Sequence, residues 1–334
     1  MKNITIGEVA EQAKVSKSTV SQYLNKRYEY MSEATRKRIE AAIEELNYHP
    51  NIVARSLKQK STFTVGVIVA NILHSFSTQI LRTIENDLNK TGFHVIICNA
   101  DDQPEKERNY IEMLLAKQVD GLIIFPTGGN IDLYEQMKKK NFPVVFMDRK
   151  IEELGIDTVM LDNHQAARMA ISEFVESDYT KISIITTSII RNTSPRVERI
   201  EGYKAAMTEH GLPVLPEYIK TADAEDLQGV LQELFALEAP PEAILAGNDI
   251  VLIEVLKFAK EHRLAIPGDV AVIGIDEVSF ASFYTPPITV VAQPTIKMAN
   301  KATELLLEQI NSENKTARTA IYRLQPSLIK RDSC

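Results

Sequence analysis

TIGEVAEQAKVSKSTVSQYLN, residues 5–25, has the pattern of two short helices joined by a tight turn. Thr5 followed three residues later by Glu8 is a capping box, so a helix is expected to begin at residue 6. It ends after about two turns, and Ser16 is a good N-cap for a second helix over residues 17–25. The expected apolar face of this pair consists of Ile6, Val9, Ala10, Ala13, Val15, Val20, Tyr23 and Leu24.

A third helix is expected to follow Ser32, with an apolar stripe of Ile39, Ala42, Ile43 and Leu46. Two short helices braced by a third are typical of a helix-turn-helix. The second helix exposes side chains that can hydrogen-bond and no carboxylate: Lys17, Ser18, Ser21 and Gln22. Such a face suits a helix that lies between phosphate rows with its side chains against base edges. The alternative is a small helical bundle with an ordinary polar surface.

Composition and charge are consistent with that interpretation. The chain has 334 residues, 44% apolar and 25% charged, which predicts a globular protein of two or three domains. Residues 1–60 hold 11 Lys and Arg against 7 Asp and Glu, whereas the whole chain has a net charge of -7. A basic head on an acidic body indicates that only the head meets a polyanion.

The sequence gives no sign of a membrane partner or a cofactor. No apolar run approaches the ~18 residues that span a bilayer, and the N-terminus lacks a signal-peptide core. Two cysteines, Cys98 and Cys334, cannot build a disulfide framework or a metal cluster. We therefore expect a cytoplasmic protein without a metal.

The residues quoted above resemble the N-terminus of the LacI/GalR family of bacterial transcriptional regulators, and the resemblance continues through MSEATRKRIEAAIEELNYHPNIVARSL. It implies a repressor that binds a pseudopalindromic DNA operator as a homodimer. The residues implied to read bases in the major groove are Lys17, Ser18 and Gln22. Those implied to contact phosphates or position the helix are Thr5, Ser16, Thr19, Ser21 and Asn25. Lys14 departs from the family, which often has Gly in this turn.

Residues 50–57 begin with Pro50 and form a candidate amphipathic helix that is too short to be stable alone. In the family such a hinge folds when two copies meet in the minor groove, where a Leu opens the central base step. Leu57 matches that wedge, and Ala54 matches the small residue that allows close approach. We expect a DNA-binding domain over 1–49, a hinge helix and linker over 50–63, and an effector-binding and dimerisation core over 64–334.

From Thr64 onward, Val- and Ile-rich runs alternate with helical stretches. The expected strands are 65–70, 94–100, 121–126, 143–148 and 158–163, then 181–186, 243–247 and 269–276; expected helices include 78–91, 104–117, 163–177, 199–210, 227–238 and 249–262. Two such sets predict two α/β lobes of parallel sheet, with a ligand in the crevice at the carboxyl ends of the strands. The predicted fold is thus α/β, a helix-turn-helix head with a two-lobed core.

The core also resembles the LacI/GalR core and, more distantly, periplasmic sugar-binding proteins, through VDGLIIFP, VVFMDR, MLDN, the segment Arg199–Tyr203, GNDIVLIEVLKFAKEHRLAIPGDVAVIGID and TPPITVVAQP. This resemblance implies an effector pocket that contains Ser77, Asp148, Arg149, Arg199, Asn248 and Asp276, with Phe76 and Phe280 as an apolar wall. Bidentate carboxylates and guanidiniums suit adjacent hydroxyls.

The expected effector is a sugar or a sugar acid. Arg149, Arg191, Arg196 and Arg199 lie near the expected pocket loops and favour an anion such as a sugar acid or sugar phosphate. QYLNKRYEYMS is also faintly similar to regulators of ketodeoxygluconate and uronate use.

Other functions remain open. A sugar-binding enzyme or transport protein is disfavoured, since the sequence has no dinucleotide or phosphate loop and no metal spacing. A regulator whose corepressor is a phosphorylated carrier protein would need a basic patch, for which Lys138–Lys140 is a candidate. The chain has no Leu heptad tail after RLQPSLIKRDSC, so a dimer rather than a coiled-coil tetramer is expected.

Overall fold

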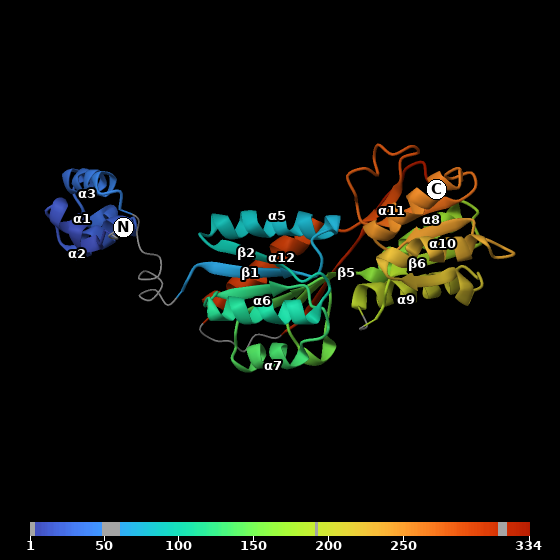
Figure 1. Cartoon of the computed structure of the whole chain (residues 1–334), viewed down its shortest axis with the longest axis horizontal. Coiled ribbons are helices and arrows are strands. Elements are labelled where there is room, and N and C mark those ends of the chain that lie inside the picture. Colours follow the sequence, from blue (N-terminus) through green and yellow to red (C-terminus); the bar gives the residue numbers. More distant parts are fainter. Residues whose placement is uncertain (1–3, 49–60, 191–192, 313–318) are drawn as a thin grey trace. The chain divides into compact units, whose positions relative to one another are not determined.

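The computed structural model describes residues 4–48, 61–190, 193–312 and 319–334. The predicted hinge residues Ala54 and Leu57 and the pocket candidate Arg191 lie outside the described residues. The chain divides into two units, Met1–Thr62 and Phe63–Cys334, each with its own core (Figure 1). Within the described residues, no helix is long and apolar enough to cross a membrane.

The first unit is a small helical domain. Its elements are α1 (Ile6–Gln12), α2 (Lys17–Leu24), the 3₁₀ turn η1 (Tyr28–Tyr30) and α3 (Glu33–Glu45). The capping box is present, because the Thr5 amide donates to Glu8 at 2.6 Å and the Glu8 amide donates back to Thr5. Ser16 accepts from the Thr19 amide at 3.1 Å and so starts α2. Every apolar residue predicted for the three helices packs in one core, so the helix-turn-helix is confirmed.

Lys14 lies in the turn between α1 and α2, at the position where the family often has Gly. Lys14 has a φ of +54°, in the left-handed region that glycine enters without steric cost. Its amide donates to the Glu11 carbonyl, and the Val15 amide donates to Ala10, which places Val15 against the core. Lysine is therefore accommodated here with some backbone strain.

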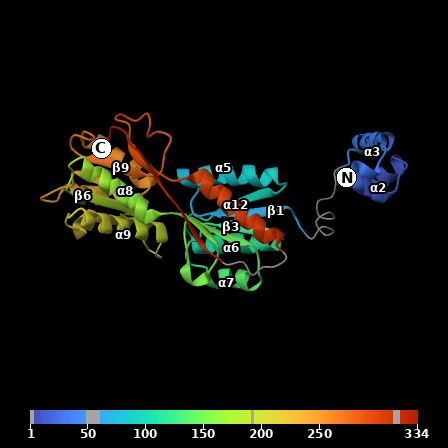
Figure 2. The same cartoon turned by 180° about the vertical axis from the view of Figure 1, so that it is seen from behind.

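The second unit has two lobes. In the first, hereafter the N-lobe, the strands are β1 (Thr64–Val69), β2 (His94–Asn99), β3 (Gly121–Ile124), β4 (Val144–Met147), β5 (Thr158–Leu161) and β11 (Ile321–Leu324). They form a parallel sheet in the order β11-β5-β4-β3-β1-β2. Helices α5 (Ser75–Lys90) and α12 (Thr295–Asn311) cover one face, and α6 (Pro104–Ala116) and α7 (Ile131–Lys139) cover the other (Figures 1 and 2).

The C-lobe repeats this plan. Its strands are β6 (Ile182–Thr187), β7 (Ile219–Ala222), β8 (Ala243–Ala246), β9 (Ala271–Ile275), β10 (Thr289–Ala292) and β12 (Ser327–Ile329), in the order β12-β10-β9-β8-β6-β7. Within the described residues, β12 pairs antiparallel with β10, and the other pairs of this sheet are parallel. Helices α8 (Asn163–Glu176) and α9 (Ser194–Glu209) cover one face; α10 (Leu227–Phe235) and α11 (Asp249–Glu261) cover the other.

The chain passes between the lobes three times, after β5, after β10 and after β11. As a result α12 and β11, late in the sequence, belong to the N-lobe (Figure 2). The sequence pattern did not indicate this return, and the elements that it named do not include α7, α12, β7, β10, β11 or β12. In addition, α9 begins at Ser194, five residues before the start that the pattern predicted.

Candidate functional site

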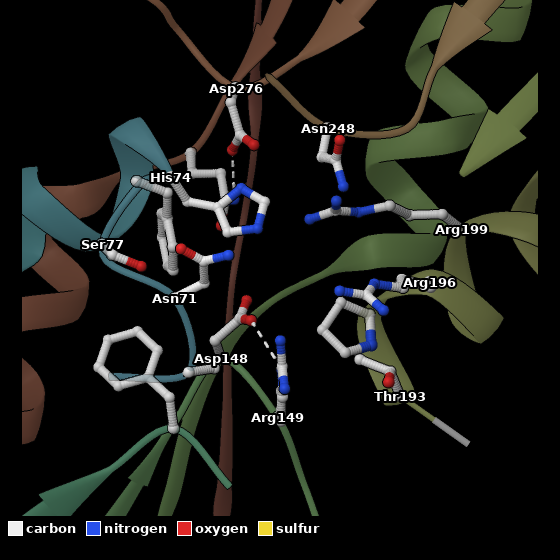
Figure 3. Close-up of a pocket in the computed structure, with 15 residues that line it drawn as sticks. Asn71, His74, Ser77, Asp148, Arg149, Thr193, Arg196, Arg199, Asn248 and Asp276 are labelled. Carbon is white, nitrogen blue, oxygen red and sulfur yellow. Dashed lines mark hydrogen bonds and ion pairs between the residues drawn. The ribbon is translucent and has the colours of Figure 1, made fainter. Parts of the chain in front are cut away.

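A cavity lies between the lobes, at the carboxyl ends of both parallel sheets. The first strands of the two lobes, β1 and β6, lie where the order of the strands in each sheet reverses. Open α/β sheets bind ligands at this point. All six predicted effector residues line this one cavity: Ser77, Asp148, Arg149, Arg199, Asn248 and Asp276 (Figure 3). The empty space inside it is about 490 Å³, with the open solvent at its mouth included.

Two aspartates occupy equivalent places in the two lobes. Asp148 follows β4 and Asp276 follows β9, and the amide of each donates to the neighbouring strand, to Val159 and Val291 respectively. Both have a positive φ, +67° and +97°, which turns the side chain from the sheet edge into the cavity. Backbone strain of this kind is often found at ligand sites.

Burial raises the pKa of both carboxyl groups, and that of Asp276 reaches about 6. Among the described residues, neither carboxyl group accepts a hydrogen bond from a cation. Gln293 donates to Asp276 at 2.6 Å, and Arg149 Nε lies 3.8 Å from an Asp148 oxygen. A hydroxyl that donates to either carboxylate would therefore stabilise its charged form.

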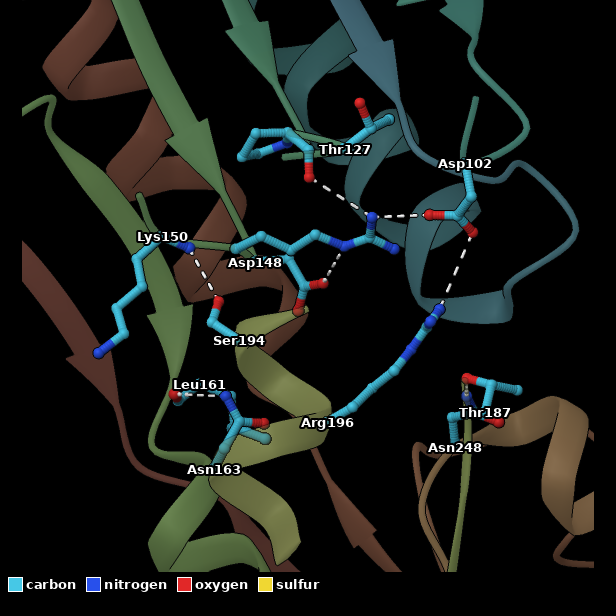
Figure 4. Close-up of polar contacts among 12 residues, drawn as sticks. Asp102, Thr127, Asp148, Lys150, Leu161, Asn163, Thr187, Ser194, Arg196 and Asn248 are labelled. Atoms are coloured by element: carbon cyan, nitrogen blue, oxygen red, sulfur yellow. Dashed lines mark hydrogen bonds and ion pairs between the residues drawn. The ribbon is translucent and has the colours of Figure 1, made fainter. Parts of the chain in front are cut away.

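The N-lobe guanidinium is held within its own lobe. Arg149 donates to Asp102 at 2.7 Å and to the Pro126 carbonyl at 3.4 Å. Burial alone would raise the pKa of Asp102, but Arg149 and Arg196 outweigh it and lower that pKa (Figure 4). The positive charge of Arg149 is thus compensated without a ligand.

The C-lobe guanidiniums contact neutral groups. Arg199 donates through Nε to Asn163 at 2.8 Å and through Nη1 to the Gly247 carbonyl at 2.5 Å. Arg196 donates to the Ser188 carbonyl and lies 3.9 Å from Asp102. Burial and repulsion from Arg149 lower the pKa of Arg196 to about 10. Among the described residues, Arg199 has no ion pair within 4 Å, and Arg196 has only its long one with Asp102.

Asn248 links the cavity wall to a helix. Its amide nitrogen donates to Thr187 at 2.9 Å, and its oxygen caps α11 by accepting from the Val251 amide. A side chain with both groups engaged is fixed in direction, which suits a residue that orients a ligand.

Hydrogen bonds also join the two lobes on the side of the cavity where the chain passes between them. The Lys150 amide donates to Ser194 at 3.0 Å (Figure 4). The buried Glu198 of α9 accepts two hydrogen bonds of 2.8 Å from Arg323 of β11. Helix α9 also carries Arg196 and Arg199. These bonds to the N-lobe therefore fix the position of the helix that brings both guanidiniums to the cavity.

The cavity contains residues that the sequence pattern did not identify as pocket residues: Asn71, His74, Phe125, Thr193 and Gln293. Gln293 follows β10, so the strand-end rule would have found it had β10 been recognised. Phe76 lines the cavity as predicted, whereas the prediction for Phe280 was wrong. Phe280 packs against the C-lobe core instead, and Phe125 supplies the second aromatic wall.

The DNA-reading candidates lie on α2 and its flanks. Lys17 and Ser18 are exposed, and Gln22 is half-buried one turn further along the helix. Thr5 and Ser16 serve as helix caps, while Asn25 donates to the Ser21 carbonyl at 2.7 Å. Thr19 is half-buried and hydrogen-bonds to Ser16 at 2.8 Å. The contacts of these residues with DNA stay predictions.

The Lys138–Lys140 run is exposed at the end of α7. Lys138 donates to the Leu154 carbonyl, and Lys139 pairs with Glu135 at 3.1 Å. Across the described part of the chain, no group of three or more His, Cys, Asp or Glu could hold a metal ion.

Comparison with known proteins accords with this architecture. Residues 5–51 match the bacterial regulatory proteins of the lacI family, and residues 171–334 match a periplasmic binding protein-like domain. The chain is 48% identical to the probable HTH-type transcriptional regulator EndR of Paenibacillus polymyxa, over 98% of both chains. It is 35% identical to the HTH-type transcriptional regulator KdgR of Bacillus subtilis, over 98% of this chain and 97% of that protein.

Solved structures agree. The alignment with the lac repressor bound to ONPG covers 100% of both chains, with 26% identity and a TM-score of 0.87. The complex of the transcriptional regulator CelR with cellobiose covers 99% of this chain and 100% of its own, at 25% identity with a TM-score of 0.74. The chain therefore belongs to the LacI family of bacterial transcriptional regulators, which are DNA-binding proteins and not enzymes.

Proposed function

We propose that this protein is a homodimeric repressor of carbohydrate-utilisation genes, and that a sugar or sugar acid bound between its lobes controls its binding to operator DNA. One observation carries the proposal. A chain with a helix-turn-helix also holds a cavity into which two lobes direct buried carboxylates, guanidiniums and an amide.

The side chains of the cavity suit a ligand with several hydroxyl groups. Asp148 and Asp276 accept hydrogen bonds, while Arg196, Arg199 and Asn248 donate them. Charged acceptors and planar guanidiniums bind pairs of adjacent hydroxyls with high directionality. The solved relatives carry ligands of this kind, since CelR is in complex with cellobiose and the lac repressor with ONPG.

An acidic sugar is compatible with the charges. Asp102 compensates Arg149, which leaves Arg196 and Arg199 opposite Asp148 and Asp276. Among the described residues Arg199 donates only to Asn163 and to the Gly247 carbonyl, so its positive charge has no hydrogen-bonded anion.

A thermal-shift panel tests the effector. It compares D-glucose and D-galactose with D-gluconate, D-glucuronate, D-galacturonate and hexose phosphates. A ligand present at ~100 times its Kd should stabilise the protein by about 2.7 kcal/mol. Galactose and galacturonate differ only at one carbon, so their difference measures the effect of the carboxylate. Stabilisation by no compound would contradict a sugar effector and favour a protein corepressor.

The DNA-binding role is tested by selecting sites from random duplexes. Lys17→Ala and Gln22→Ala should each relax preference at one or two base pairs, by roughly 1–3 kcal/mol. Lys37→Ala is the matched control, because Lys37 is an exposed lysine of α3 that pairs with Glu33. If Lys17→Ala and Gln22→Ala leave the selected profile unchanged, α2 does not read the bases. We also propose that Ala54 and Leu57 contact the minor groove of the operator.

Exposed apolar side chains on the core support the proposal of a homodimer. Leu73, Phe283 and Ile296 are 80%, 73% and 64% exposed. Gln79 of α5 links this helix to two other parts of the core, because it donates to the Glu277 carbonyl and accepts from Thr295 of α12. Two half-sites related by a two-fold axis would mirror such a dimer.

A further inference from the structure

A histidine that lines the cavity and an aspartate beside it join the two lobes. His74 precedes α5 in the N-lobe, and Asp249 is the first residue of α11 in the C-lobe. The ring Nδ1 of His74 lies 2.6 Å from Asp249 Oδ1. The two side chains are 15% and 5% exposed, so the pair is largely shielded from solvent.

Asp249 also connects the starts of two helices. Its Oδ2 accepts from the Ser75 amide at 2.7 Å, at the first residue of α5, and its Oδ1 accepts from the Ile250 amide at 2.9 Å in α11. The N-termini of both helices carry partial positive charge, and a carboxylate there is favourable to each. One anion therefore stabilises the approach of two elements that belong to different lobes.

The surroundings of His74 favour the imidazolium. Burial alone would lower its pKa, but Asp249, Asp276 and Asp102 outweigh burial and raise it. Asp148 faces the ring from the end of β4, and the opposing cations are Arg149, Arg196 and Arg199. The pKa of Asp249 is lowered, since its bonds to His74 and to the amides outweigh burial.

The second ring nitrogen is left for a ligand. His74 lines the cavity, and within the described residues only its Nδ1 has a hydrogen-bond partner. With Nδ1–H directed at the carboxylate, Nε2 is a donor in the charged ring and an acceptor in the neutral ring. The ring thus presents a different group to the cavity in each protonation state.

We propose that His74 and Asp249 form a charge-dependent latch between the lobes, and that the free Nε2 of His74 makes this latch part of the effector site. An effector oxygen that accepts from Nε2–H favours the arrangement in which the pair is formed, so ligand contact and lobe contact are linked. The ligand part rests on the function proposed above, whereas the latch itself does not.

The latch is tested in the full-length protein without ligand, by NMR titration of the imidazole rings. The chain has six histidines, and His74→Gln assigns the signal by its disappearance. The expected result is a His74 ring protonated on Nδ1 when neutral, with a midpoint above 6.5. Asp249→Asn should lower that midpoint by about one pH unit or more, a tenfold loss in proton affinity.

His164→Gln is the matched control, because His164 lies 3.7 Å from Glu201 in an exposed pair away from the cavity. It should leave the His74 midpoint unchanged. A His74 midpoint that is the same with and without Asp249 would overturn the latch. If Asp249→Asn does not fold, the stability of wild type and His74→Gln is compared from pH 6 to 8.5. The difference should shrink as pH rises, because a raised histidine pKa stabilises only while the ring is charged, and a constant difference overturns the latch.

The ligand contact is tested with the panel compound that stabilises the protein most. Its addition should shift the Nε2 resonance of His74 and not that of His164, and His74→Gln should weaken its binding at pH 6 more than at pH 8.5. Equal weakening at both values would overturn the contact. If no panel compound binds, the proposed function fails, and the ligand-free titration still decides the latch.

Discussion

The two lobes have the same strand order, and yet they hold their cavity side chains in different ways. Each places an aspartate with a positive φ after equivalent strands, β4 and β9. The N-lobe then pairs its Arg149 with Asp102, whereas the C-lobe holds Arg199 with an amide and a carbonyl oxygen. The backbone plan thus determines where polar groups appear, and the neighbouring residues determine which of them keeps charge for a ligand.

The largest expected effect distinguishes the two arginines. Arg199→Lys should weaken binding of the panel compound by roughly a hundredfold or more, because one ammonium cannot hold Asn163, Gly247 and a ligand together. Arg149→Lys should cost less, on the order of tenfold, since Asp102 compensates either cation. Isothermal titration calorimetry measures both.

Arg168→Lys is the control for this pair, because Arg168 is a half-exposed residue of α8 that pairs with Glu209. It should leave affinity unchanged. Equal losses for Arg149→Lys and Arg199→Lys would show that the lobes contribute equally, and would break the comparison.

A second effect concerns the free energy of unfolding, which the buried aspartates lower when they are charged. A buried carboxyl group with a raised pKa binds its proton more tightly in the folded protein, so stability falls as pH rises from about 4 through 6. Asp276→Asn removes this loss. Without ligand it should stabilise the protein at pH 8 by about 2 kcal/mol, and by little at pH 4.

Thermal unfolding followed by circular dichroism measures this difference. Asp226→Asn is the control, since Asp226 is exposed at the start of α10, and it should show no such dependence. Asp148→Asn should behave like Asp276→Asn, because burial raises the pKa of Asp148 as well. A destabilised Asp276→Asn at pH 8 would mean that the carboxylate has a structural partner in the ligand-free protein.

The same contrast explains what the sequence could predict. The helix-turn-helix follows from local signals alone, since its caps Thr5, Ser16 and Ser32 and its apolar spacing lie within 45 described residues. The cavity aspartates were predicted because strand ends and family motifs mark them. Strand β11 was missed because it is a short edge strand with alternating partial burial. His74 was missed because its partner Asp249 is 175 positions away, and no local pattern reveals such a contact.

The smallest expected effect tests how the two lobes share the ligand. If a hydroxyl of the effector donates to Asp276, the carboxyl group must ionise on binding, and its pKa of about 6 places that event near neutrality. Affinity should therefore rise about tenfold from pH 5 to 7, and then fall at higher pH as His74 loses its proton. Calorimetry at several pH values should show the rising limb abolished in Asp276→Asn and the falling limb abolished in His74→Gln. Because Asp276 belongs to the C-lobe and His74 to the N-lobe, loss of both limbs in either variant would mean that the two groups titrate as one unit across the cavity.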